Sequence, residues 1–104
     1  MKSLKVKVGH VRVSIKWEEG LSRLCQVTGV SGTDLQDVRI DDDLGPDVER
    51  ETVLHELLHH AFTQTVLEKM FTDEQEEQII WGLSPLILQM WRENPKLRDY
   101  LLGE

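Results

Sequence analysis

The segment from His55 to His59 places two histidines four residues apart, within residues 46–64, whose pattern is that of one amphipathic helix. Four steps of about 100° bring the second imidazole only about 40° past the first, so both can bind one metal ion. Glu56 follows His55 and borders the same side of the helix. In the pattern H-E-x-x-H, two neutral imidazoles hold zinc and the glutamate takes a proton from a zinc-bound water. The sequence therefore predicts a Zn²⁺ site with ligands His55 and His59 and with Glu56 as general base.

A third protein ligand is expected, because catalytic zinc usually has three protein ligands and a water. The extended motif that continues with a glycine and a third histidine is excluded, since Phe62 and Thr65 occupy those positions. His60 points about 100° away from His59. His10 lies in a distant predicted turn. A carboxylate is therefore favoured as the third ligand.

The candidate carboxylates lie at the start of the next predicted helix, after Thr72. They are Glu74, Glu76 and Glu77. Glu76 shares a helical face with Ile80 and points toward the core, whereas Glu77 leans further toward solvent. We therefore expect Glu76 to be the third ligand, with Glu77 as the alternative.

The reach of Glu76 sets a condition on the length of the first helix. Two antiparallel helices bring Glu76 level with the histidines only if the first helix ends near Gln64. A helix that ran on to Met70 would leave Glu76 about 10 Å short of the ion. Residues 66–71 fit either a continuation of the helix or an apolar connector, so the position of the helix end tests the ligand choice.

Three strands are predicted before the helix. Apolar residues alternate with polar ones in residues 4–8 and 11–15, and Gly9 between these runs is suited to a hairpin turn. Residues 36–41 indicate a third strand, and residues 29–34, rich in glycine and hydroxyl side chains, indicate a loop. The N-terminal half is therefore expected to form a small sheet.

Helices are predicted after the connector. The capping sequence that starts at Thr72 begins a helix with a break at residues 82–85, and a second break is expected at residues 94–95. A last short helix, residues 96–102, is expected to pack back on the body through its apolar residues. These are Leu97, Tyr100 and Leu101.

Together these elements predict an α+β fold. It consists of a small antiparallel sheet of about three strands in the N-terminal half, packed on the H-E-x-x-H helix and on a C-terminal helical segment. A chain of 104 residues is long enough for one modest core, so residues 1–104 are expected to form a single domain.

Charge and cysteine content narrow the functional class. A formal net charge of -7 argues against nucleic-acid binding, which needs a basic face. Cys25, the only cysteine, cannot form an internal disulfide and is interpreted as a packing residue. The surrounding residues 18–25 fit either a short helix or the tail of the second strand. Without a signal peptide or membrane-spanning run, a cytoplasmic protein is expected, with no membrane partner.

The motifs resemble those of a known enzyme class. The H-E-x-x-H segment resembles that of the gluzincin metallopeptidases. The residues that follow it and carry the rest of the resemblance are Glu76-Glu77, Ile79-Ile80 and Leu83-Ser84-Pro85. In size the chain is similar to the minigluzincins, and residues 76–85 are loosely similar to ImmA/IrrE-type peptidases of phages and mobile elements. The resemblance covers roughly the C-terminal half of the chain.

This resemblance implies a zinc-dependent peptidase that hydrolyses a protein or peptide substrate. It further implies a sheet whose edge strand, residues 36–41, lines the cleft and pairs with an extended peptide. The alternative is a non-catalytic, zinc-stabilised module that binds a protein partner or has a regulatory role. A metal-free scaffold that uses Trp81 and Trp91 for partner contacts is a third interpretation, although core packing explains these tryptophans more simply.

Overall fold

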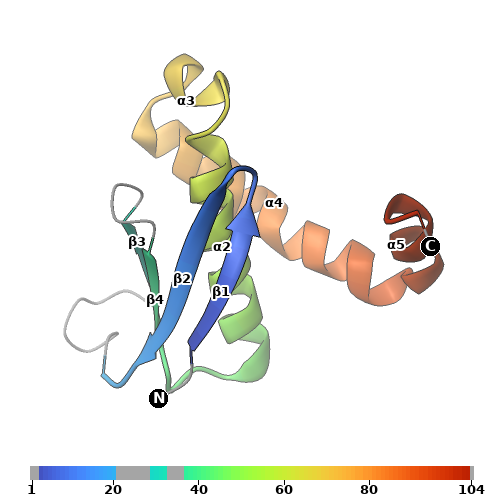
Figure 1. Cartoon of the computed structure of the whole chain (residues 1–104), viewed down its shortest axis with the longest axis horizontal. Helices are drawn as coiled ribbons and strands as arrows, with labels where there is room; N and C mark the ends of the chain where they lie inside the picture. The colour runs from blue at the N-terminus through green and yellow to red at the C-terminus, as the bar shows by residue number, and fades with distance from the viewer. Residues whose placement is uncertain (1–2, 21–28, 33–36, 104) are drawn as a thin grey trace.

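The computed structural model describes residues 3–20, 29–32 and 37–103. The strands are β1 (Ser3–Val8), β2 (Val11–Glu18), β3 (Gly29–Gly32) and β4 (Asp37–Asp41). The helices are α2 (Pro46–Phe62), α3 (Leu67–Met70), α4 (Asp73–Glu93) and α5 (Pro95–Leu101). Strands come first and helices follow, with α2 packed against one face of the sheet (Figure 1). The predicted α+β class is confirmed; Cys25 lies outside the described residues.

The sheet is mixed, with the strand order β1-β2-β4-β3. β1 and β2 form the predicted antiparallel hairpin, in which Gly9 has a φ of 60°. β2 and β4 are parallel, in a register that runs from Ser14 opposite Asp37 to Glu18 opposite Asp41. The prediction that the sheet of about three strands is antiparallel is therefore wrong for the pair β2 and β4, because alternation of apolar residues identifies a strand but not the direction of its neighbour.

The fourth strand, β3, lies where a loop was predicted. It pairs antiparallel with β4 and contains two glycines in four residues, a composition that disfavours strands in isolation. β4 consequently lies between β2 and β3, and among the strands that the structure describes the sheet edges are β1 and β3. The prediction that residues 36–41 form an edge strand is wrong.

The core lies between the sheet and α2. The alternating residues Val13 and Ile15 of β2, and Val38 and Ile40 of β4, are fully buried. Partly buried residues pack against them from α2 and from the loop before it, namely Leu44, Val53 and Leu57. The predicted period-two pattern of these strands is confirmed, since their inward-facing residues form the core.

The most buried side of α2 is largely polar. The buried residues are Thr52, Glu56, His60 and Phe62. The amphipathic pattern of residues 46–64 predicts instead a buried stripe of apolar residues, and those other than Phe62 are only partly buried. They are Leu54, Leu57, Leu58 and Ala61. The hydrophobic pattern alone missed this because the most buried side of α2 also carries polar side chains.

Hydrogen bonds of the Gln64 side chain connect the end of α2 to the β1–β2 hairpin. Its side-chain amide donates hydrogen bonds to the carbonyls of Val8, at 2.7 Å, and His60, at 3.2 Å. Its side-chain oxygen accepts one from the backbone N–H of His10, at 3.1 Å. α2 ends at Phe62, close to Gln64, which meets the condition that the reach of Glu76 sets on the length of this helix. A separate short helix, α3, lies in the connector.

α4 begins as predicted and then continues past Pro85. Thr72 and Gln75 form the predicted capping box. The predicted break at residues 82–85 is wrong, since α4 runs unbroken to Glu93. Its one internal proline removes a backbone N–H, while the hydroxyl of Ser84 donates to the carbonyl of Ile80 at 2.6 Å. The predicted break at residues 94–95 is confirmed.

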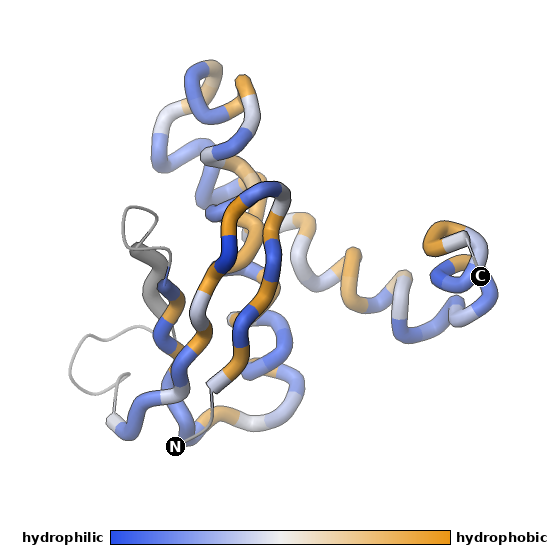
Figure 2. The backbone as a smooth tube through the Cα atoms, viewed as in Figure 1, coloured by the Kyte–Doolittle hydropathy of each residue, from blue (hydrophilic) through white to orange (hydrophobic). Residues whose placement is uncertain are grey.

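The last helix, α5, does not return to the body. The later part of α4 and α5 project away from the sheet and α2, and hydrophobic residues recur along them (Figures 1 and 2). Leu97, Tyr100 and Leu101 are 39%, 78% and 63% exposed, so their predicted packing is wrong. Within the described residues, none of the helices combines the length and the apolar character needed to cross a bilayer.

Candidate metal centre

α2 presents the two predicted histidines side by side. The Nε2 atoms of His55 and His59 lie 3.3 Å apart, and their ring centroids are 5.0 Å apart in an edge-to-face arrangement. Two nitrogen ligands at about 2.0–2.1 Å from a tetrahedral ion are separated by about 3.4 Å. The spacing of one helical turn therefore sets the two nitrogens at a separation suited to a shared metal ion.

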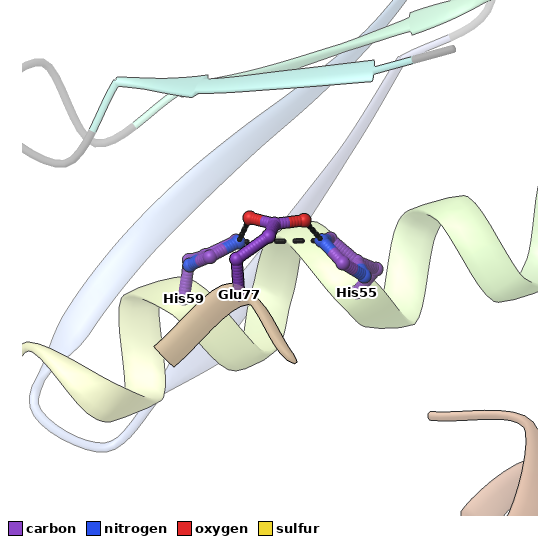
Figure 3. A group of neighbouring side chains, drawn as sticks. All are labelled: His55, His59 and Glu77. Atoms are coloured by element: carbon purple, nitrogen blue, oxygen red, sulfur yellow. Dashed lines mark hydrogen bonds and ion pairs between the residues drawn. The ribbon is translucent and has the colours of Figure 1, made fainter. Parts of the chain in front are cut away.

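Glu77 of α4 completes this group. Its two carboxylate oxygens lie 2.6 Å from Nε2 of His55 and 2.9 Å from Nε2 of His59 (Figure 3). The three candidate ligand atoms all lie within 4.8 Å of one another. His55, His59 and Glu77 can therefore hold a metal ion between α2 and α4.

Glu76, the expected third ligand, is not part of this group. Its carboxylate lies 2.6 Å from Nδ1 of His59, on the opposite side of the imidazole from Glu77. Its side chain is 13% exposed and that of Glu77 is 47% exposed, in the predicted order of burial. The alternative, Glu77, meets the histidines because their Nε2 atoms lie at the rim of the core, where the more exposed carboxylate reaches them.

The contact of Glu76 with His59 has a chemical consequence. A carboxylate at Nδ1 holds the N–H on that nitrogen, which leaves the Nε2 lone pair available for an ion and fixes the orientation of the ring. Two adjacent glutamates of α4 thus contact different nitrogens of His59. Glu77 is placed as a candidate ligand, and Glu76 supports the ligand beside it.

We expect Glu76→Ala to lower the affinity for zinc by about 10–100-fold without abolishing binding, as loss of an outer partner of a ligating histidine does. Competition titration against a chelator measures the change. Glu74→Ala is the matched control, because Glu74 is an exposed glutamate on the same helix. Complete loss of zinc in Glu76→Ala would instead make Glu76 a ligand, and unchanged affinity would show that its contact with His59 has no effect.

Glu56 lies beside the metal group in a buried position. It is 8% exposed, and this burial raises the pKa of its carboxyl group. The nearby His55 and His59 act in the opposite direction, and Glu77 adds to the increase in pKa. A carboxylate with a raised pKa is a better proton acceptor at neutral pH. The predicted general base therefore has an environment suited to proton transfer.

The raised pKa of Glu56 predicts a pH-dependent stability of the metal-free protein. The folded state binds this proton more tightly than the unfolded state, so its contribution to stability is largest at low pH. It is lost as the pH rises from the ordinary carboxyl range through the raised pKa. Glu56→Gln should therefore stabilise the metal-free protein at pH 7, on the order of 1 kcal/mol, because a buried charge is removed.

Thermal unfolding of both metal-free proteins between pH 4 and pH 7.5 measures this difference. The advantage of Glu56→Gln should grow with pH and then level off. An advantage that stayed constant across this range would show that ionisation of Glu56 does not set the difference.

His60 has a place in the structure that sequence reasoning missed. It is 2% exposed, and its Nε2 lies 3.4 Å from the backbone carbonyl of Asp37 at the start of β4. A signal was available, because Thr52, Glu56 and His60 recur at four-residue spacing and so lie along one side of a helix. His60 therefore connects α2 to the sheet and stands apart from the three candidate ligands.

No protein-family model matches the sequence, and comparisons with curated proteins and with solved structures find no match either. What the chain does is therefore inferred from the residues of the metal centre themselves.

Proposed function

We propose that this chain is a small zinc-dependent peptidase that hydrolyses a peptide bond, with His55, His59 and Glu77 as ligands and Glu56 as general base. The observation that carries the proposal is the convergence of these residues. Two imidazoles from α2 and one carboxylate from α4 have their ligand atoms within 4.8 Å of one another. Glu56, the residue after the first histidine, lies buried beside them.

The donor set supports zinc as the metal. Two histidines and one glutamate are a known set for catalytic zinc, and three protein ligands leave the fourth position of a tetrahedral ion to water or substrate. Zinc bound there supplies a nucleophile at neutral pH by lowering the pKa of its water, and it polarises the scissile carbonyl. A soft metal such as Cu(I) is disfavoured, because the three donors include no thiolate or thioether.

The protein residues then have distinct roles. Glu56 accepts the proton of the attacking water and passes it to the leaving amine, which a carboxylate with a raised pKa can do. Glu76 holds the ring of His59 through its Nδ1. The order H-E-x-x-H on one helix supports a peptide as the substrate, since this arrangement has a known mechanism in metalloproteases.

A cleavage assay tests the proposal. The zinc-loaded full chain is incubated with a degenerate peptide library, and the products are identified by mass spectrometry. We expect discrete cleavage that stops when a chelator removes the metal and returns when zinc is restored. A chain with one bound zinc per molecule that cleaves no peptide or protein would contradict the proposal.

One observation favours a second function. α4 and α5 expose large apolar residues, among them Leu86 at 60%, Tyr100 at 78% and Leu101 at 63%. Such surface in a chain with a candidate metal centre also suits a zinc-stabilised module that binds a protein partner without catalysis. In that case zinc would be required for partner binding, and Glu56→Gln would leave this binding unchanged.

A further inference from the structure

Trp81 lies at the border of the metal centre. It follows Glu77 by four residues on α4, which places the two side chains on the same side of the helix, one turn apart. Its indole ring meets the imidazole of His55 edge-to-face, with the ring centroids 6.3 Å apart and the planes at 79°. The indole therefore stands next to a candidate ligand, on the side of the site away from Glu76.

The exposure of Trp81 is unusual for an indole in such a position. Trp81 is 68% exposed, whereas Trp17 in the core is 6% exposed. The edge contact with His55 leaves most of the apolar ring surface in water, which is unfavourable unless another apolar group covers it. Core packing, the simpler explanation suggested by the sequence, does not account for this side chain.

We propose that Trp81 forms the wall of a substrate subsite that accepts a large apolar side chain, aromatic or branched aliphatic, next to the scissile bond. This inference rests on the proposed peptidase function. A carbonyl that is attacked at the metal centre brings the neighbouring side chain within a few ångströms of His55, where the indole stands. An aromatic substrate side chain can then stack on the exposed ring.

The charges around the site define what this subsite rejects. Glu77, a candidate ligand, lies one turn from Trp81, and Glu56 and Glu76 add two carboxylates beside the metal group. An acidic substrate side chain there meets like charge, which disfavours binding. The subsite is therefore selective for apolar side chains and against acidic ones.

Two small zinc-chelating compounds test the subsite by binding alone. The hydroxamate of phenylalanine carries a benzyl group beside its chelating end, and the hydroxamate of alanine carries only a methyl group. Calorimetry with the zinc-loaded full chain should show about 10-fold tighter binding of the phenylalanine compound. In Trp81→Ala this ratio should fall to about 2 or less, whereas Trp81→Phe should keep most of it.

Trp91→Ala is the matched control. Trp91 is a second partly exposed tryptophan of α4, ten residues further along, and its exposure is 46%. This variant should keep the wild-type ratio. An unchanged ratio in Trp81→Ala would overturn the subsite, and so would an equal loss in Trp91→Ala.

The outcomes also separate this inference from the proposed function. A wild-type ratio that depends on Trp81, without cleavage of any peptide, would support the subsite and contradict the peptidase. Peptide cleavage at equal rates beside phenylalanine and alanine, in wild type and in Trp81→Ala, would support the peptidase and overturn the subsite. If neither hydroxamate bound the zinc-loaded chain, the centre would not present an open metal, and both would be overturned.

Discussion

Replacing His59 by alanine should leave the purified chain with little or no bound zinc. Apparent binding free energies of about 10–16 kcal/mol for structural zinc imply several kcal/mol per ligand, so losing one ligand should weaken binding by about 100-fold or more. His59 also contacts both Glu76 and Glu77, and removing its ring breaks the link between these residues. Metal analysis after exhaustive dialysis, together with a chelator titration, measures the loss.

His10→Ala is the control for this result. The chemical change is the same, but His10 is exposed in the β1–β2 turn and its backbone, not its ring, bonds to Gln64. This variant should bind zinc as the wild type does. Glu77→Ala should resemble His59→Ala. Stoichiometric zinc in His59→Ala would show that the three-residue group is not the metal site.

Replacing Glu56 by glutamine should separate metal binding from catalysis. Glutamine keeps nearly the same shape but cannot accept the proton of the attacking water. General-base catalysis contributes about 10²–10⁴-fold to the rate, so peptide cleavage should fall by about that factor. Zinc content should stay the same, because Glu56 is not among the three candidate ligands. Initial rates on a cleaved peptide, normalised to bound zinc, measure the effect.

Glu51→Gln is the matched control, since Glu51 is an exposed glutamate of the same helix, five residues earlier. It should cleave at the wild-type rate. Equal rates in Glu56→Gln and wild type would mean that another group accepts the proton. A loss of zinc in Glu56→Gln would assign Glu56 to the ligands and remove it as a separate base.

The sequence was sufficient for features set by local geometry. The spacing of His55 and His59 fixed their common side on α2, and the capping residues fixed the start of α4. The end of α2 was left open, and helical rise gave only the condition that it lie near Gln64 if Glu76 is to reach the histidines. Each of these depends on helical rise and rotation, which are nearly the same in every α-helix.

Features set by distant contacts were not predictable in this way. The parallel pairing of β2 with β4, and the addition of β3, depend on which strands meet in space. Glu76 was ranked above Glu77 as a ligand because it was expected to be more buried, and this order of burial is correct. Glu77 nevertheless joins the candidate ligand group in place of Glu76, because the Nε2 atoms of the histidines lie at the rim of the core, where the more exposed Glu77 reaches them. Single-residue preferences are too weak to override such tertiary arrangements. The continuation of α4 through Pro85 is a separate case, since local rules favour a break there and the buried residues of α4, Ile80 and Ser84, precede the proline.

A metal ion bound at this centre also affects how α4 is held against α2. Among its described residues, only Ile80 and Ser84 of α4 are buried. His55 and Glu77, 22 residues apart in sequence, lie on different helices. An ion held by both residues cross-links the two helices and closes a short loop of chain between them. Because such an ion binds only when α4 is packed on α2, its binding free energy stabilises that packing. Removing it should loosen α4 and move Trp81 away from His55, while the core between the sheet and α2 stays packed. In the proposed peptidase, a bound metal therefore also holds the proposed Trp81 subsite next to His55.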